Sequence, residues 1–295
     1  MIVAIGVDVD DTFVRFVQTA LEAEIEPRCI NLRVAVEGEW RFELPARTPA
    51  RLRYAGEEIA LSPEDSYFCR LIDLSAASEP SAAKRWRALT AALRGFLDTA
   101  PGRVVNRPSS GLHNSSKPLH EATLRNLGFR VPESITSSDP DKLRAFVSEG
   151  PTISKALCGA RADAVMVTDE DLAQFDPQSG PVHMQRCVPG DDARIHVVGR
   201  EVIAQRVGAD SVDYRRAGAI SRMTVFDPPE PLRDRLIDAT AALGLAFAGW
   251  DFKIDSSENY WCLEANPMPG YGPYDAYCDG AISGAVRGYL NSEST

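Results

Sequence analysis

The sequence lacks the groups that would place it in several common protein classes. Its six cysteines form no C-x-x-C pair and its four histidines no H-x-x-x-H pair, so we expect no zinc cluster. A disulfide framework is not expected either, because the chain has 295 residues. No apolar run approaches the ~18–20 residues of a membrane span. Residues 1–7 have no basic stretch and no small-residue cleavage site, so we expect no signal peptide, and we interpret the chain as a cytoplasmic protein with reduced thiols.

Positive charge is also scarce. The 42 acidic and 32 basic residues give a formal net charge of −10 at pH 7. Neutralising nucleic-acid phosphates requires a basic surface, so we expect no nucleic-acid partner. Only five of the basic residues are lysines, and each can therefore be examined individually: Lys84, Lys117, Lys142, Lys155 and Lys253.

Three frequent motifs for nucleotide binding or nucleophilic catalysis are missing. The segment from Gly150 to Lys155 lacks the second glycine of the G-x-x-x-x-G-K-[ST] phosphate loop. No G-x-G-x-x-G follows a strand and opens a helix, and no G-x-S-x-G elbow is present. The sequence therefore favours neither a P-loop nor a Rossmann protein nor a serine hydrolase.

Hydrophobic residues make up 44% of the chain, which is enough for a sizeable core. In the first ~100 residues, strands and helices alternate, which predicts an α/β lobe with a largely parallel sheet. Strands are expected over 2–7, 29–36, 40–44, 67–71 and 103–106, helices from Asp10 or Asp11 and over 81–99, and an irregular connection over 45–66.

The loop 107–116 is dense in turn formers, and we place the first domain boundary there. After it, helices are expected over 116–127, 139–148, 169–174 and 230–243, and one running toward Leu290. Single strands are expected over 152–157, 164–167 and 182–188, and hairpins over 193–207 and 247–264. The last third of the chain is thus rich in strands.

The second hairpin is the most informative segment. In residues 250–255, side chains alternate, with Asp251, Lys253 and Asp255 on one face. A two-residue turn at Ser257-Glu258 would place Asp251 opposite Glu264, on the same face. Such a pair of carboxylates suits Mg²⁺, whereas the alternative interpretation is a solvated polar face. A slip of one residue would separate the two carboxylates.

The residues around this hairpin resemble the metal-binding end of ATP-grasp ligases. The resemblance rests on Gly249-Trp-Asp-Phe-Lys-Ile-Asp255 followed by Tyr260-Trp-Cys-Leu-Glu-Ala-Asn-Pro-Met-Pro-Gly270. It implies that Asp251, Glu264 and Asn266 hold two Mg²⁺ ions, with Mn²⁺ as an alternative, that bridge the phosphates of ATP.

Two lysines fit the same family. Lys155 lies on the short apolar strand from Thr152 to Leu157, and Lys117 opens the helix after the boundary loop. The resemblance implies that both reach the nucleotide phosphates. The alternative for each is a solvated surface lysine.

The segment Val182-His-Met-Gln-Arg-Cys-Val-Pro-Gly-Asp-Asp-Ala-Arg194 is similar to the inter-lobe hinge of the family. By that similarity, Gln185 would meet the adenine amino group and the main chain of Cys187 and Val188 would pair with the ring. Asp192 would accept hydrogen bonds from the ribose hydroxyls, and Arg194 would face the phosphoryl group.

Further along, Asp213-Tyr-Arg215 resembles an element of the RimK-like branch and of the ligases that cyclise ribosomal peptides. It implies that Arg215 binds the acceptor carboxylate or its acyl phosphate, for which a planar guanidinium is suited. The chain continues with Arg216-Ala-Gly218, where this branch often has an Asn and a Gly pair.

Together these motifs predict an α/β (α+β) chain with a pre-ATP-grasp domain over 1–106, a central lobe over 107–182 and a C-terminal lobe over 183–295. The implied activity is an ATP-dependent carboxylate–amine ligase that forms an amide through an acyl phosphate and releases ADP and phosphate. The partners would be a small carboxylate and an amine, such as an amino acid or peptide. Open alternatives are a macrocyclase for a ribosomal precursor peptide, a non-catalytic nucleotide-binding protein, and an α/β scaffold whose match is fortuitous. The oligomeric state is open, with a homodimer among the alternatives.

Overall fold

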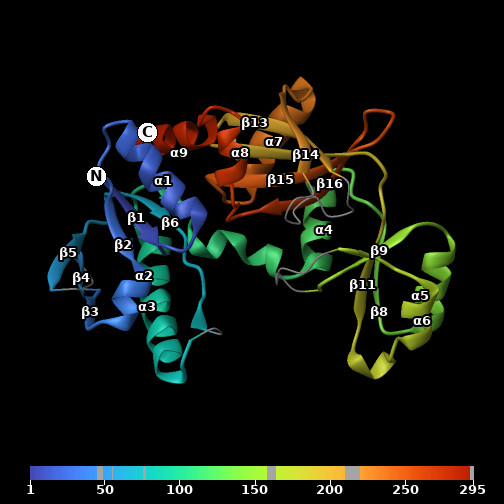
Figure 1. The fold of residues 1–295 in the computed structure, drawn as a ribbon, viewed down its shortest axis with the longest axis horizontal. Helices are drawn as coiled ribbons and strands as arrows, with labels where there is room; N and C mark the ends of the chain where they lie inside the picture. Colours follow the sequence, from blue (N-terminus) through green and yellow to red (C-terminus); the bar gives the residue numbers. More distant parts are fainter. Residues whose placement is uncertain (45–48, 55, 76–77, 158–163, 210–219, 293–295) are drawn as a thin grey trace.

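The fold is seen in a computed structural model of the chain, which describes residues 1–295 except 45–48, 55, 76–77, 158–163, 210–219 and 293–295 (Figure 1). The first sheet has the strand order β2-β1-β6-β7, and all its pairs are parallel. This confirms the predicted parallel sheet of the first lobe. Its strands are β1 (Ile2–Gly6), β2 (Arg28–Asn31), β6 (Ser66–Cys69) and β7 (Val104–Val105).

Helices α1 (Asp11–Glu22) and α3 (Pro80–Thr99) supply apolar faces to the cores on this sheet. The start of α1 is capped by Asp10, whose carboxylate accepts a hydrogen bond from the Thr12 amide at 3.2 Å. Helix α3 confirms the helix predicted over 81–99, and it buries an apolar stripe that includes Trp86, Leu89 and Leu93.

Two expectations for this lobe were wrong. The strand predicted over 29–36 ends at Asn31, whose side chain accepts from the Arg33 amide at 3.1 Å and starts helix α2 (Leu32–Glu37). The segment 45–66 is not irregular throughout: β4 (Ala50–Tyr54) and β5 (Glu57–Leu61) form an antiparallel sheet with β3 (Trp40–Glu43). Charged side chains on the exposed face obscured the alternation that buries Leu52 and Leu61.

The second unit begins with a 3-10 segment, η2 (Pro108–Ser115), and helix α4 (Lys117–Asn126). An antiparallel sheet follows, of order β10-β9-β11-β8. Its strands are β8 (Ser134–Ser137), β9 (Thr152–Lys155), β10 (Val165–Met166) and β11 (Val182–Arg186), and α5 (Pro140–Ser148) and α6 (Asp169–Gln174) lie at its side in Figure 1. Strand β8 was not predicted, and the sheet continues past residue 182, where we had placed the boundary between the two later lobes.

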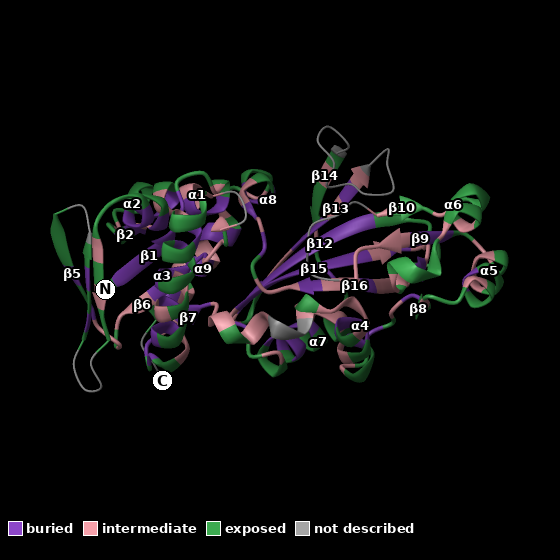
Figure 2. Cartoon of the chain, turned by 90° about the horizontal axis from the view of Figure 1, so that it is seen from below, coloured by how far each residue is buried: buried purple, intermediate pink, exposed green. Residues whose placement is uncertain are grey.

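The third unit is a five-stranded antiparallel sheet of order β14-β13-β12-β15-β16. Its elements are β12 (Asp191–Val198), β13 (Glu201–Ala209), β14 (Ile220–Phe226), α7 (Glu230–Ala242), β15 (Phe247–Ile254), β16 (Tyr260–Asn266), α8 (Gly272–Ala276) and α9 (Ala281–Asn291). Both predicted hairpins are present, whereas β14 was not predicted. The central strands β12 and β15 are almost entirely buried, as Figure 2 shows.

One face of this sheet is apolar and packs with α7 and α4, so that Trp250, Phe252, Leu124 and Leu236 share one core. The other face carries polar side chains, which are described below. No helix in the described part of the chain has the length and hydropathy needed to cross a membrane.

The side chain of Asn106 joins the first unit to the third. Its Nδ2 donates to the carbonyls of Phe247 and Pro267, and its Oδ1 accepts from the amides of Ala246 and Phe247, both at 2.9 Å. Phe247 is the first residue of β15, and Pro267 directly follows Asn266, the last residue of β16. Asn106 therefore fixes both the start of β15 and the loop after β16.

Candidate active site

The polar face of the C-terminal sheet brings together side chains from three adjacent strands. Arg194 of β12 lies directly opposite Asp251 of β15, and Asp251 lies directly opposite Glu264 of β16. Directly opposed residues share a face, so the two carboxylates and the guanidinium form one row. The predicted opposition of Asp251 and Glu264 is confirmed.

The register between β15 and β16 arises from a different loop than the one predicted. Asp255 and Asn259 close a loop of three residues, 256–258, instead of a two-residue turn, and Glu258 adopts a left-handed φ of 57°. Further along the hairpin, Phe252 pairs with Cys262 but Asp251 pairs with Glu264, so Leu263 is an extra, bulged residue. The longer loop and the bulge compensate for each other, which is why the expected opposition still holds.

Arg194 and Asp251 form a buried ion pair, with 2.7 Å between Nη1 and Oδ1. Gly249 makes room for it: a Cβ built on Gly249 would lie 2.2 Å from Nη2 of Arg194 and 2.6 Å from Cβ of Pro269. The glycine of the Gly-x-Asp motif is therefore required by the arginine that lies over it. In this arrangement Arg194 contacts Asp251, and a contact with a phosphoryl group stays a prediction.

Glu264 is surrounded by groups that favour its ionised form. Nζ of Lys117 lies 3.2 Å and Nδ2 of Asn114 lies 3.1 Å from Oε1 of Glu264. Burial raises the pKa of Glu264, but the charge of Lys117 and the hydrogen bonds from Asn114 and Lys117 outweigh it and lower the pKa to about 2. The predicted position of Lys117 at the start of a helix is confirmed, and its ammonium contacts the Glu264 carboxylate.

The donor set fits a magnesium ion. Asp251 and Glu264 share a face with Asn266, which lies opposite Gly249 and whose Oδ1 accepts from the Met268 amide at 2.8 Å. Beside Glu264, Oδ1 of Asn114 is buried and has no hydrogen-bond partner among the described residues. Among the same residues no group of three or more His, Cys, Asp and Glu side chains could hold a metal ion, so the donors that the site offers are two carboxylates and an amide. Two carboxylates and an amide suit Mg²⁺, which keeps waters and takes phosphate oxygens.

Asp192 is held by a lysine that the sequence analysis did not assign to the site. Nζ of Lys253 lies 2.9 Å from Oδ2 of Asp192 and 3.2 Å from the Gly190 carbonyl. The two residues are direct partners across β12 and β15. The alternation of residues 250–255 already placed Lys253 on the face of Asp251, and this was the signal that could have found it.

A second polar cluster lies on the central sheet, under α4. Nζ of Lys155 donates to Oε1 of Gln185 at 2.6 Å, and Nε2 of Gln185 donates to Oε1 of Glu121 at 2.6 Å. His183 places Nε2 3.0 Å from the same carboxylate and Nδ1 2.9 Å from Oγ1 of Thr136. Glu121, His183 and Gln185 are all buried, and sequence reasoning found only Gln185 among them.

Electrostatics keep Glu121 charged. Burial raises its pKa, but hydrogen bonds with His183 and Ser134 and the charges of His183 and Lys155 outweigh burial, and the pKa is lowered. Gln185 therefore has its amide orientation set by two charged neighbours, with the nitrogen toward Glu121 and the oxygen toward Lys155. The predicted contact of Gln185 with adenine would use a side chain that is already oriented.

The remaining predicted residues are placed as follows. The amide of Cys187 donates to the Pro151 carbonyl at 2.9 Å, so the carbonyl of Cys187 and the main chain of Val188 are the groups left for a base. Arg215 lies outside the described residues.

Comparisons with known proteins show which fold the chain shares. No protein-family model matches the chain. The chain is 25% identical to human N-acetylaspartylglutamate synthase A over 206 residues, which are 64% of this chain and 52% of that protein. It thus spans about half the length of the curated relatives it matches.

Two solved structures are similar over nearly the whole chain. The ATP-grasp ligase PsnB, complexed with a phosphomimetic variant of its minimal precursor, Mg and ADP, has a TM-score of 0.81, 22% identity and 98% coverage of both chains. The macrocyclase MdnC from Microcystis aeruginosa MRC, bound with precursor peptide MdnA, has a TM-score of 0.81, 18% identity and 100% coverage of both chains. The protein therefore has the ATP-grasp fold that the sequence predicted.

Proposed function

We propose that the protein is an ATP-dependent carboxylate–amine ligase that forms an amide through an acyl phosphate and releases ADP and phosphate. The observation that carries the proposal is the row of Arg194, Asp251 and Glu264, in which Arg194 pairs with one carboxylate and Lys117 with the other. This row is compatible with two Mg²⁺ ions at Asp251, Glu264 and Asn266, and Mg²⁺ would neutralise charge on the phosphates of ATP.

The chain's own residues would supply the rest of the chemistry. Gln185, with the main chain of Cys187 and Val188, would bind the adenine, and Asp192 would accept from the ribose. The ammonium groups of Lys155 and Lys117 and the guanidinium of Arg194 would stabilise the triphosphate and the phosphoryl group in transfer.

The substrate carboxylate would attack the γ-phosphate of ATP, so that its oxygen bonds to phosphorus and the bond to the ADP oxygen breaks. The amine would then attack the acyl carbon and displace phosphate, and Arg215 would stabilise the oxyanion of that step. An acyl phosphate requires a site closed to water, which would otherwise hydrolyse it.

Thermal unfolding with ATP, alone and with Mg²⁺, tests the nucleotide site. A ligand at ~100 times its dissociation constant adds about 2.7 kcal/mol to the free energy of unfolding. We expect a Mg²⁺-dependent rise in the midpoint that is lost in Glu264→Gln and kept in Glu258→Gln, a control on the loop of the same hairpin. An equal shift in both variants, or none in the wild type, would contradict the proposal.

The reaction class is tested with candidate carboxylates and hydroxylamine in place of the amine. We expect ADP, phosphate and a hydroxamate of the carboxylate in equal amounts. AMP and pyrophosphate in their place would indicate an acyl adenylate and refute the acyl phosphate.

A precursor peptide is the second candidate for the substrate. It is favoured by one observation, which is that the similar solved structures include an ATP-grasp ligase complexed with a variant of its minimal precursor and a macrocyclase bound with a precursor peptide. The two candidates differ in product. Mass spectrometry of a peptide with acidic residues would show a loss of one water for each crosslink, whereas ligation of a small amine would add the mass of the amine less one water.

A further inference from the structure

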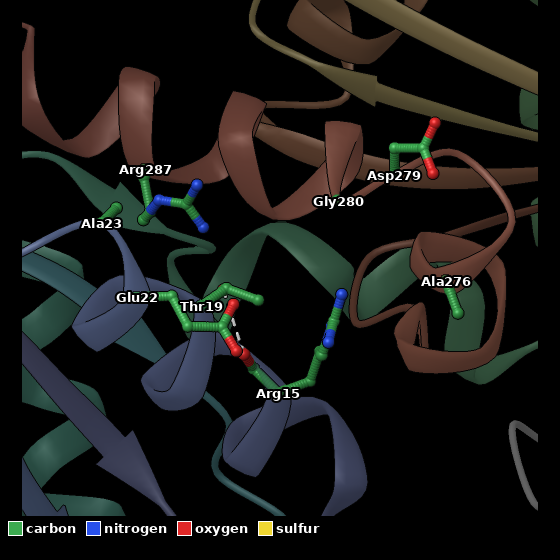
Figure 3. A pocket seen from close by; sticks show the side chains of 8 residues that line it. All are labelled: Arg15, Thr19, Glu22, Ala23, Ala276, Asp279, Gly280 and Arg287. Carbon is green, nitrogen blue, oxygen red and sulfur yellow. Dashed lines mark hydrogen bonds between the residues drawn. The ribbon is translucent and has the colours of Figure 1, made fainter.

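A pocket of about 250 Å³ lies between α1 and the α8–α9 segment, and none of its lining residues belongs to the site described above. Figure 3 shows it from close by. The residues that matter for its chemistry are Arg15, Thr19 and Glu22 of α1, and Asp279, Gly280 and Arg287 of the α8–α9 segment.

Arg15 is fixed at this pocket by a buried acid. Its Nε lies 2.9 Å from Oδ2 of Asp275, which is fully buried. Asp275 also accepts from the amide of Ser283 at 3.0 Å and from its hydroxyl at 2.6 Å. The acid is therefore held in place, and its contact with Nε leaves the two terminal nitrogens of Arg15 to face the pocket (Figure 3).

Arg287 supplies a donor that lacks an acceptor. Its Nη1 is buried and has no hydrogen-bond partner among the described residues. Figure 3 shows its guanidinium pointing into the space between α1 and α9. An unpartnered donor of a charged group is costly, and an anion bound beside this half-buried guanidinium would offset that cost.

The rim of the pocket has the opposite charge. Glu22 and Asp279 are exposed side chains that line it. They would repel a dianion such as phosphate and attract an ammonium group. A guanidinium pair matches the two oxygens of a carboxylate. We propose that this pocket binds a small zwitterion, a free amino acid in its simplest form, with the carboxylate on Arg15 and Arg287 and the amine toward Glu22 and Asp279.

The test is thermal unfolding of the full chain with each standard amino acid, with acetate and with inorganic phosphate, at equal concentration and ionic strength and without ATP. We expect at least one amino acid to raise the midpoint more than acetate and phosphate do. Titration calorimetry should then show that Arg287→Gln lowers the affinity for this amino acid about tenfold or more. Asp279→Asn should reduce the ratio of the affinity for this amino acid to the affinity for the analogue that lacks the amine. Asparagine is chosen because it tolerates the left-handed φ of 51° at this position.

Arg94→Gln is the matched control, because Arg94 is an exposed arginine in another hollow, on α3. It should leave the affinity unchanged, and Arg287→Lys should keep part of it if Arg287→Gln fails to fold. The proposal is overturned if no amino acid binds, if phosphate binds more tightly, or if Arg287→Gln binds as the wild type does. Binding of ATP with Mg²⁺ should be the same in all these variants, so the result is independent of the proposed ligase function.

Discussion

Replacing Gly249 with alanine should destabilise the protein by displacing an arginine. The new Cβ would lie 2.2 Å from Nη2 and 2.6 Å from Cζ of Arg194, well inside van der Waals contact. The same Cβ would lie 2.6 Å from Cβ of Pro269, so moving the arginine alone does not relieve the overlap. Arg194 would have to leave Asp251, and breaking a buried ion pair in this way costs about 3–5 kcal/mol.

The size of the effect can be converted to a temperature. Unfolding entropies of about 2.1 cal/mol/K per residue give roughly 0.6 kcal/mol/K for 295 residues. A loss of about 3 kcal/mol then lowers the midpoint by about 5 °C. Differential scanning calorimetry of the two proteins measures this shift directly.

Gly95→Ala is the control of opposite sign. Gly95 lies inside α3 and a Cβ there meets nothing within 4 Å, so alanine should stabilise the helix by about 0.5–1 kcal/mol. If Gly249→Ala unfolds at the wild-type temperature while Gly95→Ala behaves as expected, Arg194 is not held where the structure places it. The account of the Gly-x-Asp motif given above would then be wrong.

Three further substitutions test other parts of the structure. Asn106→Ala removes the hydrogen bonds to Ala246, Phe247 and Pro267 and should lower the free energy of unfolding by about 2–4 kcal/mol in urea denaturation, whereas retention of wild-type stability would show that the joint is dispensable. The pKa of Glu121 is lower in the folded state, so its charge stabilises the protein above the unfolded-state pKa, and this stability is lost as the pH falls through the folded-state pKa. Glu121→Gln should therefore flatten the decline of the free energy of unfolding at acid pH. An unchanged pH profile would contradict the assignment. Lys253→Met removes the ion-pair partner of the buried Asp192 carboxylate and should weaken nucleotide binding about tenfold in calorimetry. Equal affinity in the variant would exclude a role for Lys253 in orienting Asp192.

Local patterns predicted the elements that show a single regular signal. The two C-terminal hairpins and most helices follow directly from alternation and from apolar spacing. Strands with charged outer faces, such as β4 and β5, were missed because their buried side chains are separated by arginines and glutamates. Helix α2 was read as a strand because Val34 and Val36 favour extended backbone, and the cap at Asn31 outweighs that preference.

The site was predictable within one hairpin and less so between distant segments. Asp251 and Glu264 lie on one hairpin, so their opposition could be predicted locally, although it holds only because the bulge at Leu263 offsets the longer loop. Arg194 faces Asp251 only because β12 pairs with β15, and no local pattern fixes that pairing. Glu121 likewise reaches His183 and Gln185 through the packing of α4 on the central sheet, which depends on tertiary structure.

The bulge at Leu263 has a consequence for how such sites can change in length. Deleting Leu263 would leave a regular ladder in which Asp251 still faces Glu264 and Gly249 still faces Asn266. A hairpin loop that is one residue shorter would also keep both pairs, because the strands on either side retain their register. The number of residues between the two carboxylates is therefore free to vary among related chains, and a motif search that fixes this spacing would overlook proteins with the same metal-binding face.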